Sequence, residues 1–238
     1  MNLRALDELA RGDGDVLAQH RKALGTGYEI ATRFLALHVD VVIAAGEVSN
    51  KTASVEEQAA ALTLGHSCNV FLALLGSALR GEFDAAAYQL RGHFDAVSLA
   101  IAVVSDAAAA QKYRDGRLRA GDARERWVRA IREREGEAIA NDFDRRMKLL
   151  KTRLDDSTHA GQRHVNLAID RIDGVRNLTL GGRFDAETVV SFVRLALSNE
   201  ATGLVLIGVA APKFLPERWV EQVRDAFLQL NAWSNGTN

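Results

Sequence analysis

Apolar residues recur at helical spacing along most of this chain. Over residues 84–105, DAAAYQLRGHFDAVSLAIAVVS, a turn of about 100° per residue places Leu90, Phe94 and Val97 on one face. A narrow row of polar side chains, called the polar row below, follows another face: Asp84, Tyr88, Arg91, Asp95 and Ser98. An ordinary surface helix has a broad charged face. A narrow polar row flanked by Ala, Leu and Val therefore indicates a helix whose polar side contacts other parts of the protein.

Similar patterns predict helices along the rest of the chain. Ser54 and Glu57 have the spacing of a capping box at the start of one helix, and Asp185 precedes another. We expect the Gly12–Gly14 stretch to end a short first helix and Gly25–Gly27 to kink or break the second. The predicted helices cover about 2–11, 15–48, 55–80, 84–105, 106–156 (as two helices), 186–211 and 216–231. Only two prolines occur, both near the C-terminus, which favours long uninterrupted helices.

Residues 164–184 differ from this helical pattern. The Asp-Gly pair at 173–174 is a favoured two-residue hairpin turn, and it lies between two β-compatible runs. This pattern predicts a small β-hairpin, and a frayed helix followed by a loop is the alternative. The predicted fold is therefore an all-α multi-helix bundle, a single domain over 1–238. Its core bundle spans about 15–163, and the hairpin and C-terminal helices span about 164–232.

Composition favours a soluble protein of a reducing compartment. Of the 238 residues, 47% are hydrophobic and 26% are charged, which is enough to bury a large core. The single cysteine, Cys68, excludes an intramolecular disulfide. The N-terminal residues are polar where a signal peptide is apolar, and the longest apolar run, Gly203–Ala211, is about half of what spans a bilayer as a helix. We therefore expect a cytoplasmic protein with no membrane partner.

Positive charge is concentrated between Arg114 and Arg153, where 13 Lys or Arg stand against 8 Asp or Glu. A basic stretch of this kind, with Trp127 inside it, could contact the phosphates of RNA. The interleaved acidic residues would repel a phosphate backbone and pair with basic neighbours on the same helix. We therefore favour a solvated pair of helices and keep RNA as an alternative partner.

The six histidines do not form a metal-binding motif. The sequence contains no HExxH and no second cysteine, and His159 and His164 are too far apart to share a helix face. Cys68 lies in an apolar run, which is typical of a small core residue and not of a catalytic thiol. We therefore expect neither a metal nor a cofactor.

A second group of polar residues, LDDSTHAGQRH, ends the charged segment at 154–164. We expect it to dock on the polar row and to form one cluster of five residues: Tyr88, Arg91, Asp95, Ser157 and His159. Arg91 and Asp95 are four residues apart, and we expect them to be largely buried as a pair, because a buried guanidinium needs a carboxylate. This cluster is a candidate ligand-binding site or a structural network.

The two polar segments resemble motifs of a known group of proteins. The sequence LRGHFD, Leu90–Asp95, followed by DDSTH, is similar to the LRxxxE and Ser…His motifs of a family of uncharacterised bacterial helical proteins. That family is distantly similar to the HEPN superfamily of helical RNases and defence proteins, over about residues 60–165 here. The HEPN motif is Arg, four to six residues, then His, and Arg153 and His159 match it. The resemblance implies that His159 acts as general base or acid on a ribose 2′-hydroxyl, that Arg153 stabilises the phosphorane charge, and that the site forms across a dimer.

Another stretch, Arg33–His38, has the same spacing, and we interpret that match as accidental. Two hypotheses for function follow. The first is a helical binding or interaction module of a bacterial stress or defence setting, with a homo-oligomeric or other protein partner, whose polar cluster is structural or holds a small ligand. The alternative is a metal-independent endoribonuclease of HEPN type, and the residues leave open whether the chain is an enzyme.

Overall fold

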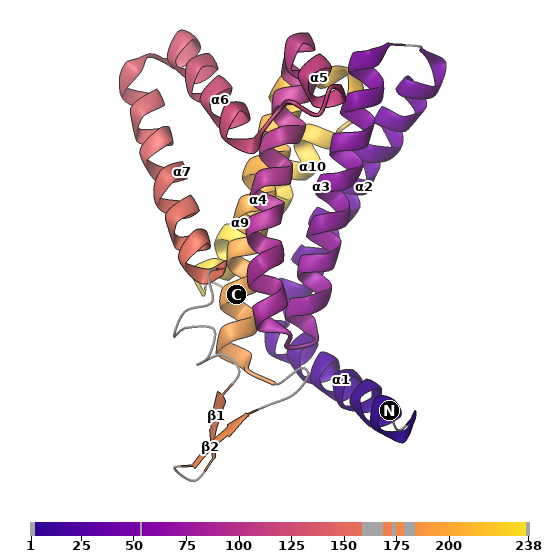
Figure 1. Ribbon diagram of the computed structural model, residues 1–238, viewed down its shortest axis with the longest axis vertical. Coiled ribbons are helices and arrows are strands. Elements are labelled where there is room, and N and C mark those ends of the chain that lie inside the picture. The colour runs from indigo at the N-terminus through magenta and orange to yellow at the C-terminus, as the bar shows by residue number, and fades with distance from the viewer. Residues whose placement is uncertain (1–2, 53, 159–168, 173–174, 179–183, 237–238) are drawn as a thin grey trace.

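Long helices build nearly all of the computed structural model (Figure 1). The structure describes residues 3–52, 54–158, 169–172, 175–178 and 184–236. The helices are α1 Leu3–Leu24, α2 Thr26–Lys51, α3 Val55–Leu79, α4 Phe83–Ser105, α5 Ala107–Arg114, α6 Ala120–Glu135, α7 Glu137–Thr158, α9 Ala186–Ala210 and α10 Trp219–Ser234, with a 3-10 turn, η1, at Pro212–Phe214. This architecture confirms the predicted all-α multi-helix bundle.

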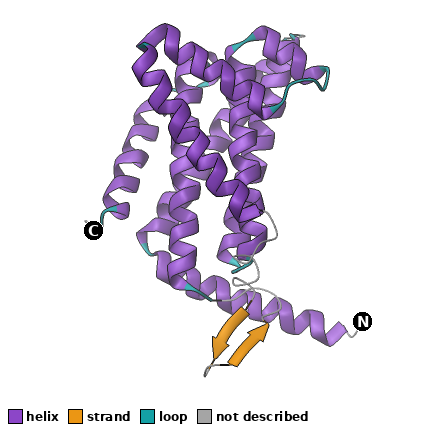
Figure 2. Cartoon of the chain, turned by 60° about the vertical axis from the view of Figure 1, so that its left-hand side comes forward, coloured by secondary structure: helices purple, strands orange, loops and turns teal. Residues whose placement is uncertain are grey.

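Two short strands, β1 Ile169–Ile172 and β2 Val175–Leu178, pair in antiparallel register beyond one end of the bundle (Figure 2). A hairpin is predicted for residues 164–184. Within that range, the structure describes only these two strands and Phe184. The predicted turn of the hairpin, 173–174, lies outside the described residues, as do 164–168 and 179–183.

The core lies between α2, α3, α4 and α9, where the apolar faces meet. Helix α3 packs on α2 and α4, and α9 packs on α4. Completely buried side chains such as Phe34, Phe71 and Leu204 fill the space between them. Helix α10 closes the outer side of α2 and α9, and the Trp219 indole N–H donates to the Leu37 carbonyl oxygen at 2.8 Å. The apolar stripes of these helices therefore meet in a shared core.

Glycines allow two pairs of helices to approach closely. At Gly203 in α9, an added Cβ would lie 2.7 Å from Val97 Cγ1 in α4. At Gly27 in α2, an added Cβ would overlap the Trp233 ring of α10. A side chain at either position would force its neighbour to move, because packed interiors have little free space.

Substituting Gly27 with alanine should lower the free energy of unfolding by about 1–3 kcal/mol, the usual cost of overpacking a core. Gly46, on the same helix, is the matched control because a Cβ there meets nothing within 4 Å. The Gly46→Ala variant should be more stable than the native chain by up to about 1 kcal/mol, since alanine favours a helix. Urea unfolding followed by circular dichroism measures both, and equal effects at the two positions would contradict the close contact with Trp233.

The predicted helix starts are confirmed at two positions, and one predicted helix end is wrong. The Ser54 hydroxyl accepts a hydrogen bond from the Glu57 backbone N–H at 3.5 Å, and the Asp185 carboxylate accepts one from the Thr188 N–H at 2.9 Å. The first helix does not end at Gly12–Gly14. Helix α1 continues until Gly25, whose φ of 50° ends it. Each glycine inside a helix costs about 1 kcal/mol, which the helix tolerates here.

Helices α6 and α7 form a helical hairpin, called the arm below, that diverges from the bundle (Figure 1). Gly136, with φ of 91°, makes the break between them. The arm packs on the bundle through α4, and its Trp127 and Phe143 rings lie 6.2 Å apart between centroids. Arg126 pairs with Asp106, which also caps α5. The arm is therefore held to the bundle by an ion pair, and its two helices share an aromatic contact.

Candidate functional site

Of the predicted polar cluster, the structure describes the side chains of Tyr88, Arg91 and Asp95. Arg91 and Asp95 are paired as predicted, with 2.5 Å between Nη1 and Oδ1. The predicted burial holds in part: the Arg91 side chain is 19% exposed and that of Asp95 is 34% exposed, while Tyr88 of the same row is 51% exposed. The pair joins neighbouring turns of one helix and is partly covered by the rest of the protein.

The other predicted site residues lie where the structure does not describe side chains. Arg153 and Ser157 belong to α7, whose backbone is described there, but their side chains are not. His159 lies outside the described residues. The docking of 154–164 on the polar row and the Arg153–His159 nuclease site therefore stay predictions.

A different group of polar residues lies in the core. The Glu200 side chain of α9 is completely buried, and both of its oxygens are bonded. His38 of α2 donates from Nδ1 to Oε1 at 2.6 Å, and His93 of α4 donates from Nε2 to Oε2 at 2.9 Å. Both imidazoles are completely buried as well. One carboxylate therefore joins three helices that are distant in sequence.

The hydrogen bonds continue beyond both imidazoles. On one side, His38 Nε2 lies 3.0 Å from the Ser67 hydroxyl of α3. On the other side, the Asn199 amide nitrogen donates to His93 Nδ1 at 3.0 Å. We call these residues the buried network: Ser67, His38, Glu200, His93 and Asn199. Every ring nitrogen and carboxylate oxygen in it has a partner, as buried polar groups require.

The network keeps the Glu200 carboxyl ionised. Burial by itself raises its pKa, but the charge and hydrogen bond of His38 and the hydrogen bond and charge of His93 outweigh that effect and hold the pKa at about 2. The nearby Cys68 thiol shows the opposite balance. Burial, followed by the charge on Glu200, raises the pKa of Cys68 to about 11. Cys68 is therefore a protonated core residue, in line with its interpretation from the sequence.

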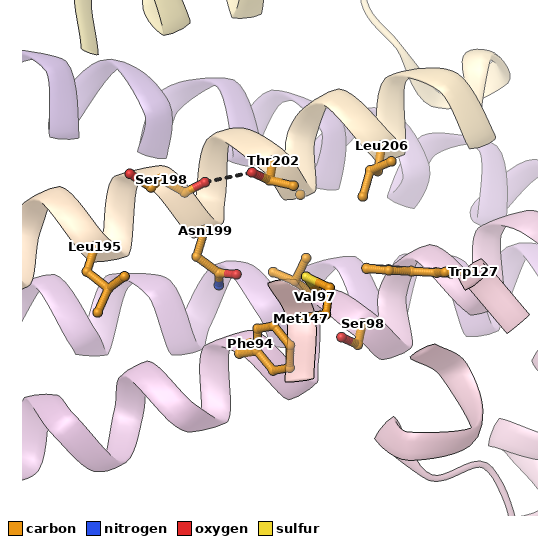
Figure 3. Close-up of a pocket in the computed structure, with 11 residues that line it drawn as sticks. Phe94, Val97, Ser98, Trp127, Met147, Leu195, Ser198, Asn199, Thr202 and Leu206 are labelled. Atoms are coloured by element: carbon orange, nitrogen blue, oxygen red, sulfur yellow. Dashed lines mark hydrogen bonds between the residues drawn. The ribbon is translucent and has the colours of Figure 1, made fainter. Parts of the chain in front are cut away.

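His93 links Glu200 to the Asn199 side chain. An ionised carboxylate only accepts hydrogen bonds, so His93 must carry its proton on Nε2. On the other side of the ring, Nδ1 lies 3.0 Å from the Asn199 amide nitrogen. The Asn199 oxygen is therefore turned away from His93. In Figure 3 this oxygen points toward Val97.

Asn199 also lines a pocket of about 160 Å³ between α4, α9 and the arm (Figure 3). The wall is formed by Phe94, Val97, Ser98, Trp127, Met147, Leu195, Ser198, Asn199, Thr202, Gly203 and Leu206. None of these side chains titrates near neutral pH. A second hollow of about 280 Å³ shares Trp127 and Leu206 with the pocket and continues it along α9. The buried network therefore ends at an amide in the wall of a mostly apolar pocket.

Helical spacing contains a signal for the buried network that the sequence reasoning missed. Along α9, buried residues follow one another at intervals of three and four, and Glu200 occupies such a position between Leu197 and Leu204. A carboxylate inside an apolar stripe needs a partner in the core. His38 belongs to the Arg33–His38 match interpreted as accidental, and the structure places its imidazole in the core.

Among the described residues, no group of three or more His, Cys, Asp or Glu could hold a metal ion. Helices α3 and α9 are long and apolar enough to cross a membrane by length and composition, and 50% and 44% of their most apolar stretches are buried in the bundle. Core helices of soluble proteins share these properties. The expected absence of a metal and of a membrane partner, and the cytoplasmic location, stay predictions.

Comparison of the chain with protein-family models, with curated proteins and with solved structures finds no match. The resemblance to the uncharacterised helical family, and through it to the HEPN superfamily, thus has no support beyond the short motifs that suggested it.

Proposed function

We propose that this chain is a helical binding module that holds a small molecule in the pocket between α4, α9 and the arm. The observation that supports this proposal is the position of Asn199. Its amide lines an apolar pocket and is oriented by a completely buried network. Ligand sites in proteins are typically apolar hollows with a few well-placed polar groups.

Burying ionic groups costs free energy, and this cost favours a role for the buried network in positioning Asn199. Replacing buried ionic groups with apolar residues of similar volume is often neutral or stabilising. A network that only held the helices together would therefore offer little advantage over Leu or Val. Here the hydrogen bonds lead from the core to a pocket wall, and polar groups fixed by a second layer of hydrogen bonds are the usual way to keep a binding group in place.

The chemistry of the wall favours binding over catalysis. Acid–base or nucleophilic catalysis needs a side chain that titrates or attacks within reach of the substrate. The described wall holds serine, threonine and asparagine but no histidine, carboxylate, lysine or cysteine. The imidazoles of the network lie behind Asn199 and already have partners on both ring nitrogens.

The wider setting stays a prediction. A bacterial stress or defence role, with a homo-oligomeric or protein partner, comes from the resemblance alone. The alternative HEPN-type endoribonuclease has no supporting observation among the described residues. His38, in one of the two Arg–His matches, is buried and bonded on both ring nitrogens, so it cannot act on RNA.

Toluene is a suitable first probe because it is apolar and of the size of one ring, and saturation-transfer NMR detects its binding to the native chain. The Leu206→Trp variant, which adds bulk inside the pocket, should weaken binding at least tenfold. Val205→Trp is the matched control, since Val205 is the neighbouring residue of α9 and lies outside the pocket wall. It should bind toluene like the native chain. No binding to the native chain, or equal loss in both variants, would overturn the proposal.

A further inference from the structure

His20 of α1 lies where the end of α3 and the start of α9 meet. Its side chain is completely buried. Nδ1 of the ring lies 3.0 Å from the carbonyl oxygen of Leu79, the last residue of α3. Nε2 lies 2.9 Å from the backbone nitrogen of Asp185, the N-cap of α9. One imidazole of α1 therefore joins the ends of two other helices.

The two backbone partners fix the protonation state of this ring. A carbonyl oxygen only accepts hydrogen bonds, so Nδ1 carries the ring proton and donates it to Leu79. A backbone N–H only donates, so Nε2 accepts with its lone pair from Asp185. Neither backbone group can exchange these roles. The contact at His20 therefore requires a neutral imidazole.

A second proton on the ring would break the contact with α9. It would sit on Nε2 and point at the Asp185 N–H, so that two donors would face each other without an acceptor. The surroundings are also apolar, because ring centroids of Phe83 and Phe184 lie 5.7 Å and 5.1 Å from that of His20. A buried charge without a partner is costly in such a setting.

Charged side chains on the surrounding elements do not bond to the ring. Arg80 pairs with Glu82 at 2.9 Å, and both oxygens of the Asp185 carboxylate are bonded to Thr188 of the same helix. The charged residues close in sequence to these contacts are Arg21 and Lys22 of α1, Glu29 of α2, Arg80 and Glu82 before α4, Asp84 of α4, and Asp185 and Glu187 of α9. None of the described carboxylates bonds to His20, so a protonated ring would lack a bonded counterion in its present position.

We infer that His20 is a pH-sensitive contact that holds α1 on the bundle while its ring is neutral and releases α1 when the ring is protonated. Histidine ordinarily gains its second proton between about pH 8 and pH 5. The docked state excludes that proton and the released state accepts it, so the docked state loses stability as the pH falls. Release would uncover Phe83, whose ring also stacks on Phe192 of α9.

NMR of the full native chain tests the inference. At about pH 7.5 the His20 ring should carry its proton on Nδ1, and the backbone amides of residues 16–24 should be protected from hydrogen exchange. At about pH 5.5 the ring should be protonated, and these amides should lose protection about tenfold, the effect of one lost hydrogen bond to a buried group. Protection is corrected for the intrinsic pH dependence of exchange. A proton on Nε2 at the higher pH, a ring that stays neutral down to about pH 5, or protonation without loss of protection would overturn the inference.

His20→Gln separates this contact from other titrating groups. The glutamine amide offers one donor and one acceptor, like the neutral imidazole, but takes up no proton in this range. Its protection over residues 16–24 should change less than about twofold between the two pH values. His66→Gln is the matched control, because it removes an exposed histidine of α3, and it should lose protection like the native chain. Equal loss in His20→Gln and in the native chain would show that other groups release α1, and the inference would be wrong.

Discussion

Replacing Glu200 with alanine should destabilise the fold by about 3–5 kcal/mol, the cost of removing one partner from a buried, bonded charge pair. The carboxylate is the acceptor for both His38 and His93. Its loss leaves two buried N–H donors unpaired and a cavity among α2, α4 and α9, and both effects lower the free energy of unfolding. Urea unfolding followed by circular dichroism measures the change.

Glu187 provides the control for this substitution. It lies on the first turn of the same helix and is exposed, so Glu187→Ala should change the free energy of unfolding by no more than about 0.5 kcal/mol. A Glu200→Gln variant should fall between the two, since the amide keeps the volume and one acceptor. If Glu200→Ala cost no more than Glu187→Ala, the buried network would not be formed in solution.

Acid should remove a stabilising contribution of about 3 kcal/mol from Glu200. The pKa of this carboxyl is about 2 in the folded chain, against an ordinary value of 4.5. A group whose pKa is lower in the folded state stabilises the fold above its unfolded pKa. That contribution is therefore complete above pH 4.5 and is lost as the pH falls toward 2.

The Glu200→Gln variant isolates this effect, because other carboxylates also titrate in this range. The free energy of unfolding should be measured from pH 6 to pH 2 for both chains. The native chain should lose more stability than the variant, and the difference should develop mainly below pH 4.5. Parallel curves would show that Glu200 does not titrate with a lowered pKa.

The apolar spacing of the sequence predicted the helices because each long helix here buries a stripe of Ala, Leu, Val and Phe. Ser54 and Asp185 were predicted as helix starts because N-capping is local chemistry. The continuation of α1 through Gly12–Gly14 was missed because glycine lowers helix propensity without forbidding a helix. The spacing predicted the Arg91–Asp95 pair but not how far each side chain is covered, because spacing gives neighbours on one helix and not what packs over them.

The buried network could not be assembled from the sequence. Glu200 is 162 residues from His38 and 107 residues from His93, and no local pattern links them. Each of these residues alone looks like a polar interruption of an apolar helix. Only the packing of α2 and α4 against α9 brings them together, and only then does Asn199 become a group fixed at a pocket wall.

The arm should be less stable locally than the core helices α4 and α9. The arm packs on the rest of the bundle through α4, whereas α4 and α9 are held by several core helices. A helical hairpin docked on a single partner opens at a lower cost than the core, so its amide hydrogens would exchange with solvent sooner. Such opening would carry Trp127 and Met147 away from the pocket while Asn199 stays in place. The rate at which a molecule enters or leaves the pocket would then depend in part on the motion of the arm.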